Sequence, residues 1–539
     1  MGSHSTHSYF GPVRNVLGDG NRSVGGSSGG SAVAIASGQA DIALGTDTGG
    51  SVRLPAAYTG IVGFKPSYGL VSRRGVIPYA NSMDTVGVLA LDVKQISGAF
   101  RMLRKHDPRD PTSITPNTRK RFKQEQRYPF TKRKINPELN STHPASGSSN
   151  PPLTNIRIGV PVEYNIAELS EEVRTAWKTT LRLLEKSGAK IIPISLPNTK
   201  HALSAYYIIA PAEAASNLSK YDGVRYGSRS AASDGEGDVL YSQTRGEGFG
   251  DEVKRRILLG SYTLSSEAID NYFIKAQKIR RLVQQDFDRV FCTPNLLRQR
   301  EQFNLSDMDE SVLLENKLGP SQVDFIVCPT APTTPPLLQE VSKQTSVDTY
   351  MNDIFTVPAS LAGLPAISVP CSLPDRDQTS SSFGPVGMQI IGQFADDFGV
   401  LGVASILEKQ LREPPGIVRF ITTQLPSQKI FSTKVSLLRI RKFKSIKGDE
   451  PLRIKKIVSG EGDEPLRITK FESRKGDQPL GVKTFVSSEE DEPLVITKFK
   501  SDKEASNPTT DKEIEKELED SLESWEWIIS PPGRSDPPS

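Results

Sequence analysis

Two serines, Ser27 and Ser51, are the residues of this sequence best placed to do chemistry, because each lies in a cluster of glycines. The first cluster reads GGSSGG from Gly25, and the second reads TDTGGS and ends at Ser51. Successive backbone N–H groups in a Gly-Gly-Ser turn can converge on one point and stabilise an oxyanion. A serine in such a turn could therefore attack a carbonyl carbon while the neighbouring amides bind its oxygen.

The residues between the two clusters predict the elements that position the serines. Residues 31–37 are small and apolar and predict a tightly packing helix that ends at Gly38. Residues 41–44 form a short apolar run that predicts a buried strand. A flexible Gly/Ser linker is the alternative, but the following VRLPAAYTGIVGFKPSYGLVS is typical of buried structure.

Several segments resemble the amidase signature family in the family's order. They are GGSSGGSAVAIASG, ALGTDTGGSVRLPAAYTGIVGFKPSYGLVSRRGVIPYANSMDTVG, RGEGFGDEVKRRILLGSYTLSS, AQKIRRLVQQDF, CPTAPTTPP and MNDIFTVPASLAGLPAISVP. Within the family, the similarity is greatest to A subunits of glutamyl-tRNA(Gln) amidotransferases. The resemblance covers about residues 1–412 and implies an α/β fold with a mixed sheet core covered by helices.

The resemblance also implies the roles of the two serines. Ser51 would be the acylated nucleophile, and Ser27, in a cis peptide, would relay the proton. The oxyanion hole would consist of the backbone N–H groups of Thr48, Gly49, Gly50 and Ser51.

For the A subunits, the resemblance implies a glutamine pocket with Arg256 on the carboxylate, Asp353 on the amino group and Tyr206 nearby. The adjacent Arg255 and Tyr207 remain alternatives. A guanidinium matches a carboxylate bidentately, and an aspartate accepts from an ammonium. Without the resemblance, the charge run GDEVKRR would predict a solvated helix face.

The family's general base, a lysine that activates the bridging serine, has no counterpart in this sequence. Only 26 residues precede Ser27, and none is a lysine. The first of them, MGSHSTHSYFGPVRN, resemble an internal segment of the family, so Met1 is expected to fall inside a longer ancestral chain. Because loss of a triad member lowers a rate by orders of magnitude, we expect little or no amidase activity from residues 1–539.

The resemblance implies partners rather than cofactors. This chain would need no cofactor of its own and would hydrolyse glutamine. Its ammonia would pass to a B subunit that uses ATP and Mg to amidate Glu-tRNA(Gln), and a small C-type subunit would join the pair. We expect a mitochondrial protein, and no membrane span because no run of about 18 apolar residues occurs.

Composition agrees with a large globular domain. The chain has 539 residues, 36% of them hydrophobic, and its net charge of +4 is too small to indicate nucleic-acid binding. The three cysteines, Cys292, Cys328 and Cys371, form no CxxC pair, which argues against a zinc site or a disulfide framework. His4 and His7 lie in an irregular polar segment and are expected to be exposed.

Two insertions and one strand–helix–strand unit with parallel strands are predicted within residues 1–412. Residues 105–152 contain the basic run RKRFKQEQRYPFTKRK, with Phe122, Tyr128 and Phe130 interleaved, and are expected to form a solvated loop. Contact with tRNA phosphates is the alternative. Residues 293–321 form a second surface loop. Strands at 156–160 and 191–196, joined by a helix capped by Ser170, predict parallel pairing, and another strand is expected at 323–327.

Residues 413–539 do not continue the resemblance. A 14-residue unit recurs from Gly448, Gly462, Gly476 and Glu490, each copy joining an acidic Pro turn to a strand-like segment. Hairpins, a small repeat array or disorder are all compatible with this low-complexity tail. An acidic segment then predicts one amphipathic helix, with Ile514, Leu518, Leu522 and Trp525 on one face.

Three rival functions stay open. The cluster at Ser27 also matches G-x-S-x-G, the nucleophile elbow of α/β-hydrolases, which requires a preceding strand and a histidine. The later histidines are His106, His143 and His201. A general amidase would differ by not needing Arg256 and Asp353. A non-catalytic assembly protein would keep the fold without the lysine.

Overall fold

The computed structural model describes residues 1–17, 20–130, 151–231, 239–298, 322–371 and 384–412, and four two-residue strands between residues 453 and 472. The chain divides into two compact units. The first comprises residues 1–423 and 527–539, and the second comprises residues 424–526.

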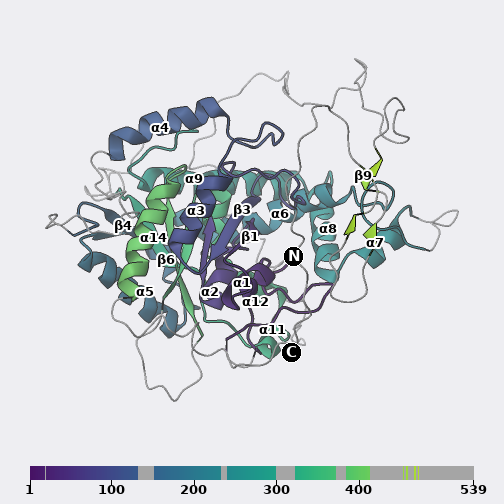
Figure 1. Cartoon of the computed structure of the whole chain (residues 1–539), viewed down its shortest axis with the longest axis horizontal. Helices are drawn as coiled ribbons and strands as arrows, with labels where there is room; N and C mark the ends of the chain where they lie inside the picture. Colours follow the sequence, from purple (N-terminus) through teal and green to yellow (C-terminus); the bar gives the residue numbers. More distant parts are fainter. Residues whose placement is uncertain are drawn as a thin grey trace, which may run out of the picture. The chain divides into compact units, whose positions relative to one another are not determined.

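An eight-stranded sheet forms the centre of the first unit, in the order β1-β3-β2-β7-β8-β6-β4-β5 (Figure 1). β4 pairs in parallel with β5 and β6, and the other neighbours are antiparallel. The strands are β1 (Ile42–Asp47), β2 (Val62–Lys65), β3 (Thr85–Ala90), β4 (Arg157–Pro161), β5 (Lys190–Ile194), β6 (Phe325–Pro329), β7 (Ala366–Cys371) and β8 (Val386–Gly392). The predicted mixed α/β fold is confirmed.

Helices cover both faces of this sheet. They are α1 (Gly29–Ala36), α2 (Arg53–Thr59), α3 (Val93–Leu103), α4 (Pro116–Phe130), α5 (Glu171–Lys186), α6 (Ala202–Leu218), α7 (Ser242–Gly248), α8 (Asp251–Thr263), α9 (Lys275–Val290), α11 (Leu338–Val341), α12 (Ser346–Met351), α13 (Val357–Ala362) and α14 (Asp397–Arg412). Two 3-10 helices, η1 (Val162–Tyr164) and η2 (Pro197–His201), and a π-helix, η3 (Asp270–Ile274), complete the described elements.

The side chains of β2 point alternately to the two faces of the sheet, and this explains why α2 and α3 lie on opposite faces. Phe64 packs edge-to-face on Phe100 of α3, with ring centroids 5.3 Å apart. The preceding residue, Gly63, faces α2, where a Cβ would come within 2.5 Å of Ala56. Successive side chains of a strand point to opposite faces. A glycine at this position therefore allows α2, all of whose residues are buried, to pack directly on the sheet.

The predicted strand–helix–strand unit is confirmed. The Ser170 hydroxyl accepts from the N–H of Val173 at the start of α5, and the helix ends at Lys186, just before Gly188. β4 and β5 run parallel on either side of it in sequence. Trp177 is buried and its indole N–H donates to the carbonyl of Val327 on β6, which anchors α5 to the sheet.

The region between the two serines differs from its prediction in two ways. α1 begins at Gly29, two residues earlier than expected. β1 is an edge strand and not a buried one, because β3 is its only neighbour among the described strands. The side chains of Ile42 and Leu44 are accordingly 39% and 50% exposed.

The first insertion contains a helix where the composition predicted a solvated loop. α4 (residues 116–130) contains residues 119–130 of the basic run. Phe122 is buried and packs edge-to-face against Phe394, with centroids 5.9 Å apart. One aromatic anchor thus orders a strongly charged segment. Residues 131–150 and most of the second insertion lie outside the described residues.

Short strands of the second unit come from two consecutive repeats. β9 (Arg453–Ile454) pairs with β12 (Phe471–Glu472), and β10 (Ile457–Val458) pairs with β11 (Arg467–Ile468), both antiparallel. The later repeats and the predicted acidic helix lie outside the described residues. Over the described parts of the chain, every helix is too short or too polar to cross a membrane.

We expect Phe122→Ala to detach α4, because truncating a buried phenylalanine costs about 3 kcal/mol or more. Trypsin should then cut after Lys120 and Arg121 at least tenfold faster than in the parent chain, as read by mass spectrometry of the fragments. Phe122→Leu keeps most of the buried area and should be cut at close to the parent rate. Equal cleavage of all three chains would show that Phe122 does not anchor the helix.

Candidate active site

The loop from Thr48 to Ser51 joins the end of β1 to the start of α2. Two of its positions admit only glycine. A Cβ on Gly49 would lie 2.6 Å from the ring of Tyr206. Gly50 has a φ of 142°, and a Cβ there would collide with the hydroxyl of Thr356. Local packing thus explains why the serine follows two glycines.

The backbone N–H groups of this loop are the main electrostatic feature of the site. Thr48, Gly49 and Gly50 are buried, and Ser51 is half-buried. Within the described residues, none of these four N–H groups donates to a protein acceptor. Buried backbone donors are nearly always paired. Four consecutive unpaired donors beside a serine hydroxyl are therefore suited to a developing oxyanion.

Ser27 lies in the loop that packs beside Ser51. The Gly26–Ser27 peptide bond is cis, the geometry that the family resemblance implies. The N–H of Ser28 donates to the carbonyl of Ser51 at 3.1 Å, which joins the two serine loops. Ser27 itself is exposed. Among the described residues, neither the Ser27 nor the Ser51 hydroxyl makes a hydrogen bond.

A fully buried ion pair holds both ends of the loop from Thr48 to Ser51, called here the nucleophile loop after the role predicted for Ser51. The Arg53 guanidinium forms two hydrogen bonds to Asp47, at 2.9 and 2.8 Å. The same carboxylate accepts from the N–H groups of Val52 and Arg53 at the start of α2. Burial opposes ionisation of Asp47, but the charge and hydrogen bonds of Arg53 hold the pKa of Asp47 below its usual value. Arg53 also donates to the Thr356 carbonyl and to Gln389 and Ser360.

The first residues of the chain form part of the site, although they contain no helix or strand. A Cβ on Gly26 would collide with the backbone of residues 2–4, so this segment lies directly against the Ser27 loop. Ser3 donates to a carboxylate oxygen of Asp353 at 2.8 Å. The expectation that His4 is exposed is wrong. His4 is buried, and its ring contacts Ser23 and Asn352.

The protonation states of His4 and Asp353 follow from their burial. Burial lowers the pKa of His4 to about 4, so the ring is neutral at pH 7. Burial raises the pKa of Asp353 to about 6, although hydrogen bonds from Ser3 and Tyr207 act in the opposite direction. Asp353 is therefore an anion at neutral pH whose charge is only partly compensated.

Arg256 faces the interior, which corrects the solvated helix face that the charge run alone predicts. It is 5% exposed, and its Nε donates to Glu252 at 2.7 Å while Nη1 donates to the hydroxyl of Tyr79 at 2.6 Å. Its guanidinium carbon lies 5.7 Å from the ring centroid of Tyr207. Arg255, the alternative, has a side chain 51% exposed and pairs with Glu252 from the outer side.

The two adjacent tyrosines of α6 contact different parts of the site. Tyr206 packs over Gly49 of the nucleophile loop. Tyr207 donates its hydroxyl to Asp353 at 3.1 Å and stacks on Tyr350. The structure therefore brings both candidates to the site.

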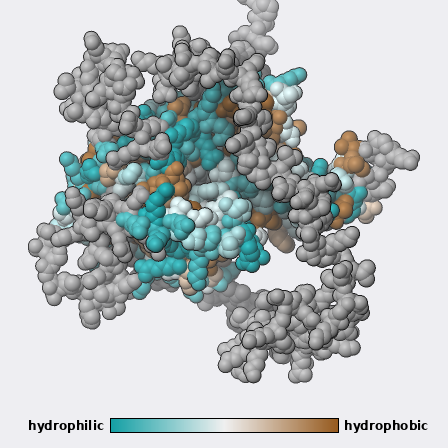
Figure 2. Space-filling view, turned by 90° about the horizontal axis from the view of Figure 1, so that it is seen from above, coloured by the Kyte–Doolittle hydropathy of each residue, from teal (hydrophilic) through white to brown (hydrophobic). Residues whose placement is uncertain are grey.

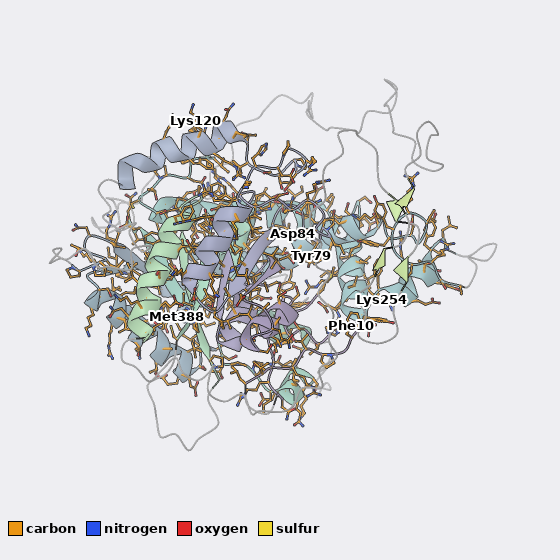
Figure 3. The ribbon with its side chains drawn as sticks, in the orientation of Figure 1. Phe10, Tyr79, Asp84, Lys120, Lys254 and Met388 are labelled. Atoms are coloured by element: carbon orange, nitrogen blue, oxygen red, sulfur yellow. The ribbon has the colours of Figure 1, made fainter. Side chains whose placement is uncertain are left out.

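The contacts close into a ring around the nucleophile loop. The Thr48 hydroxyl donates to Asp84, and the same carboxylate accepts from the backbone N–H of Tyr79, the partner of Arg256 (Figure 3). On the other side, the Thr356 hydroxyl contacts the carbonyls of Gly49 and Asp353. The predicted anion and cation sites are thus both connected to the predicted oxyanion loop.

Comparison with known proteins agrees with this geometry. Residues 1–401 match the family model described as Amidase. The chain belongs to the amidase family.

Two named relatives and one crystal structure show which members of the family the chain is similar to. The chain is 56% identical over 419 residues to the A subunit of the mitochondrial glutamyl-tRNA(Gln) amidotransferase from Podospora anserina, covering 76% of this chain and 78% of the relative. It is 58% identical over 413 residues to the protein of the same name from Fusarium vanettenii, covering 76% of each chain. The crystal structure of the glutamyl-tRNA(Gln) amidotransferase A subunit from Thermotoga maritima is 33% identical, with a TM-score of 0.52, and covers 76% of this chain and 71% of that one.

Several residues of this amidase site were not singled out from the sequence. They are Ser3, Tyr79, Asp84, Glu252 and Thr356. Tyr79 and Asp84 fall in the segment PYANSMD, whose resemblance to the family was a usable signal. Ser3 lies in MGSHSTHSYFGPVRN, which also resembles the family, but its contact with Asp353 could not be predicted because the two residues are 350 positions apart.

The hydrolase-elbow alternative lacks its structural context. A nucleophile elbow follows a strand, and the described residues before Ser27 contain no strand longer than a single bridge at Arg22. His106 contacts Ser113 in the loop after α3, and His143 lies outside the described residues. The described residues also contain no group of histidines, cysteines and carboxylates that could hold a metal ion, and all three cysteines are free thiols.

We expect Asp47→Ala to lower the free energy of unfolding by about 3–5 kcal/mol, because it leaves the Arg53 cation buried without its counter-charge. Urea unfolding of Asp47→Ala, Arg53→Met and the double variant would give the coupling between the two residues. The free energy of unfolding of the double variant should fall by much less than the sum of the decreases in the two single variants. A strictly additive double variant would mean that the pair does not act as a unit.

Proposed function

We propose that this amidase hydrolyses glutamine and supplies the ammonia for converting Glu-tRNA(Gln) to Gln-tRNA(Gln). The main observation that supports the proposal is the row of unpaired backbone N–H groups from Thr48 to Ser51, in a loop that hydrogen bonds connect to the buried Arg256 and Asp353. The names of the Podospora and Fusarium relatives support the amidotransferase assignment.

In the proposed reaction, the Ser51 oxygen attacks the carboxamide carbon of glutamine. As it does so, the Ser27 hydroxyl accepts the proton of Ser51 and donates its own proton to the carboxamide nitrogen. The N–H groups of residues 48–51 stabilise the resulting oxyanion. Collapse of this intermediate breaks the C–N bond, and the protonated nitrogen departs as ammonia. Water then hydrolyses the glutamyl ester on Ser51 to glutamate.

The charges of the pocket match the two ends of glutamine. The Nη2 group of Arg256 has no partner within the described residues and can donate to the α-carboxylate. Asp353, ionised at neutral pH, can accept from the α-ammonium. Tyr207 orients Asp353, and Tyr206 lies between this pocket and Gly49. We therefore assign substrate binding to Arg256, Asp353 and Tyr206, with Tyr207 as a positioning residue.

The rest of the proposed system lies outside this chain. Ammonia would pass to a B subunit that binds ATP and Mg and amidates Glu-tRNA(Gln), and a small C-type subunit would hold the pair together. The relatives' names support a mitochondrial location.

We expect the 539-residue chain to bind glutamine but to release ammonia orders of magnitude more slowly than a relative that contains the lysine. Ser51→Ala should abolish whatever release remains, as measured by a coupled ammonia assay, while leaving glutamine binding intact in calorimetry. Release at the rate of the lysine-containing relative would contradict the missing-base expectation. Residual release that persists in Ser51→Ala would contradict the assignment of the nucleophile.

Glutamine binding is expected to weaken at acid pH because Asp353 must be ionised to pair with the ammonium. Below the pKa of about 6, affinity should fall by about tenfold per pH unit. Ser3→Ala removes a hydrogen bond that favours the anion, so the midpoint should move to higher pH.

Calorimetric titrations from about pH 5 to about pH 8 would measure both effects. Ser8→Ala, on an exposed turn of the same segment, is the matched control and should leave the midpoint unchanged. If Asp353→Asn bound glutamine with the parent's affinity at pH 7, the proposed ammonium site would be wrong.

A further inference from the structure

The surface where α3 ends and α4 begins is strongly basic and has no part in the glutamine site. α4 contains five lysines and arginines and one acidic residue. Arg101 and Lys105, at the end of α3, and Lys120, on α4, are exposed. We call these three residues the α3–α4 basic surface. Lys120 lies on the outer side of α4 (Figure 3).

Backbone contacts hold the cations of this surface close together. Arg119 donates to the carbonyls of Arg104 and Ile114 at 2.6 Å and to that of Leu70 at 3.0 Å. Lys105 follows Arg104, and Lys120 follows Arg119. The two exposed lysines therefore extend from adjacent points of a fixed backbone, and Phe122, buried beneath them, keeps the helix in place.

The lysines of this surface are not neutralised within the described chain. Neither Lys105 nor Lys120 forms an ion pair with a described carboxylate. The nearby Asp107 pairs with Arg109. A cluster of uncompensated cations on a rigid support attracts polyanions, and phosphate contacts of this kind need no particular base sequence.

The side chains around these cations favour RNA over a lipid surface. Binding to an anionic bilayer usually combines cations with apolar side chains that insert between the lipids. Here Phe122, the aromatic residue of α4 whose side chain is described, is buried and unavailable. Met102, between Arg101 and Lys105, is 67% exposed but offers only one apolar side chain and not an inserting cluster. Seen from above, most of the described surface is hydrophilic, with smaller apolar patches (Figure 2).

We infer that the α3–α4 basic surface binds the phosphate backbone of a structured RNA directly. The choice of RNA over other polyanions rests on the proposed function, which brings a tRNA to the complex. The contact itself depends on the lysines and not on the chemistry at Ser51. The contact is electrostatic, because the buried ring of Phe122 cannot stack on a base.

The test uses the full chain and a transfer RNA transcript, with fluorescence anisotropy measured from about 50 to about 300 mM salt. The double variant Lys105→Gln/Lys120→Gln should lower affinity at low salt by about tenfold. It should also reduce the slope of log affinity against log salt by about 2, one for each lost phosphate contact. Lys105→Glu/Lys120→Glu should lower affinity further.

Lys178→Gln/Lys200→Gln is the matched control, because both lysines are exposed and the net charge changes equally. An unchanged slope in the first variant, or an equal loss in this control, would overturn the inference. Binding of anionic phosphatidylserine vesicles through the same lysines, without RNA binding, would overturn it in favour of a membrane. Melting temperatures and glutamine titrations should be unchanged in all variants. A loss of RNA binding could then be attributed to the lysines and not to unfolding or to a defect of the glutamine site.

Discussion

The buried pair of Asp47 and Arg53 is the interaction on which the site depends. Two charges without access to water are stable only when they neutralise each other and satisfy every donor. Asp47 ends β1 and accepts from the first N–H groups of α2, while Arg53 reaches the Thr356 carbonyl and Gln389. The residues between them are consequently held in one conformation by the sheet, the helix and the segment after Asp353.

This constraint explains how a loop rich in glycine can be rigid. Gly49 and Gly50 are free to turn, but the ring of Tyr206 and the hydroxyl of Thr356 leave no room for movement. Preorganised donors stabilise a transition state without a reorganisation cost at the moment of reaction. Arg256 and Asp353, the residues proposed to bind the substrate, are connected to the same loop through Tyr79, Asp84 and Thr356. The proposed binding groups and the proposed oxyanion donors therefore share one framework.

A few contacts also hold α4 in place, on a different surface of the molecule. Composition alone predicts that a segment with five cations stays solvated, because the like charges repel one another. Burial of Phe122 against Phe394, together with the hydrogen bonds of Arg119 to four carbonyls, orders it. Lys120 is then exposed on a helix whose position is fixed, as the proposed RNA contact requires.

Features that depend on local chemistry could be predicted from the sequence. The glycine clusters made Ser27 and Ser51 candidates, because positive φ and close backbone approach are properties of single residues. The β4–α5–β5 unit followed from periodicity and the Ser170 cap. That Arg256 is buried and Arg255 is exposed required the folded chain, since neighbouring residues on a helix point in different directions and the packing partner decides which one is buried. The edge position of β1, the burial of His4 and the contact of Ser3 with Asp353 likewise depend on segments far away in the chain, which no local pattern encodes.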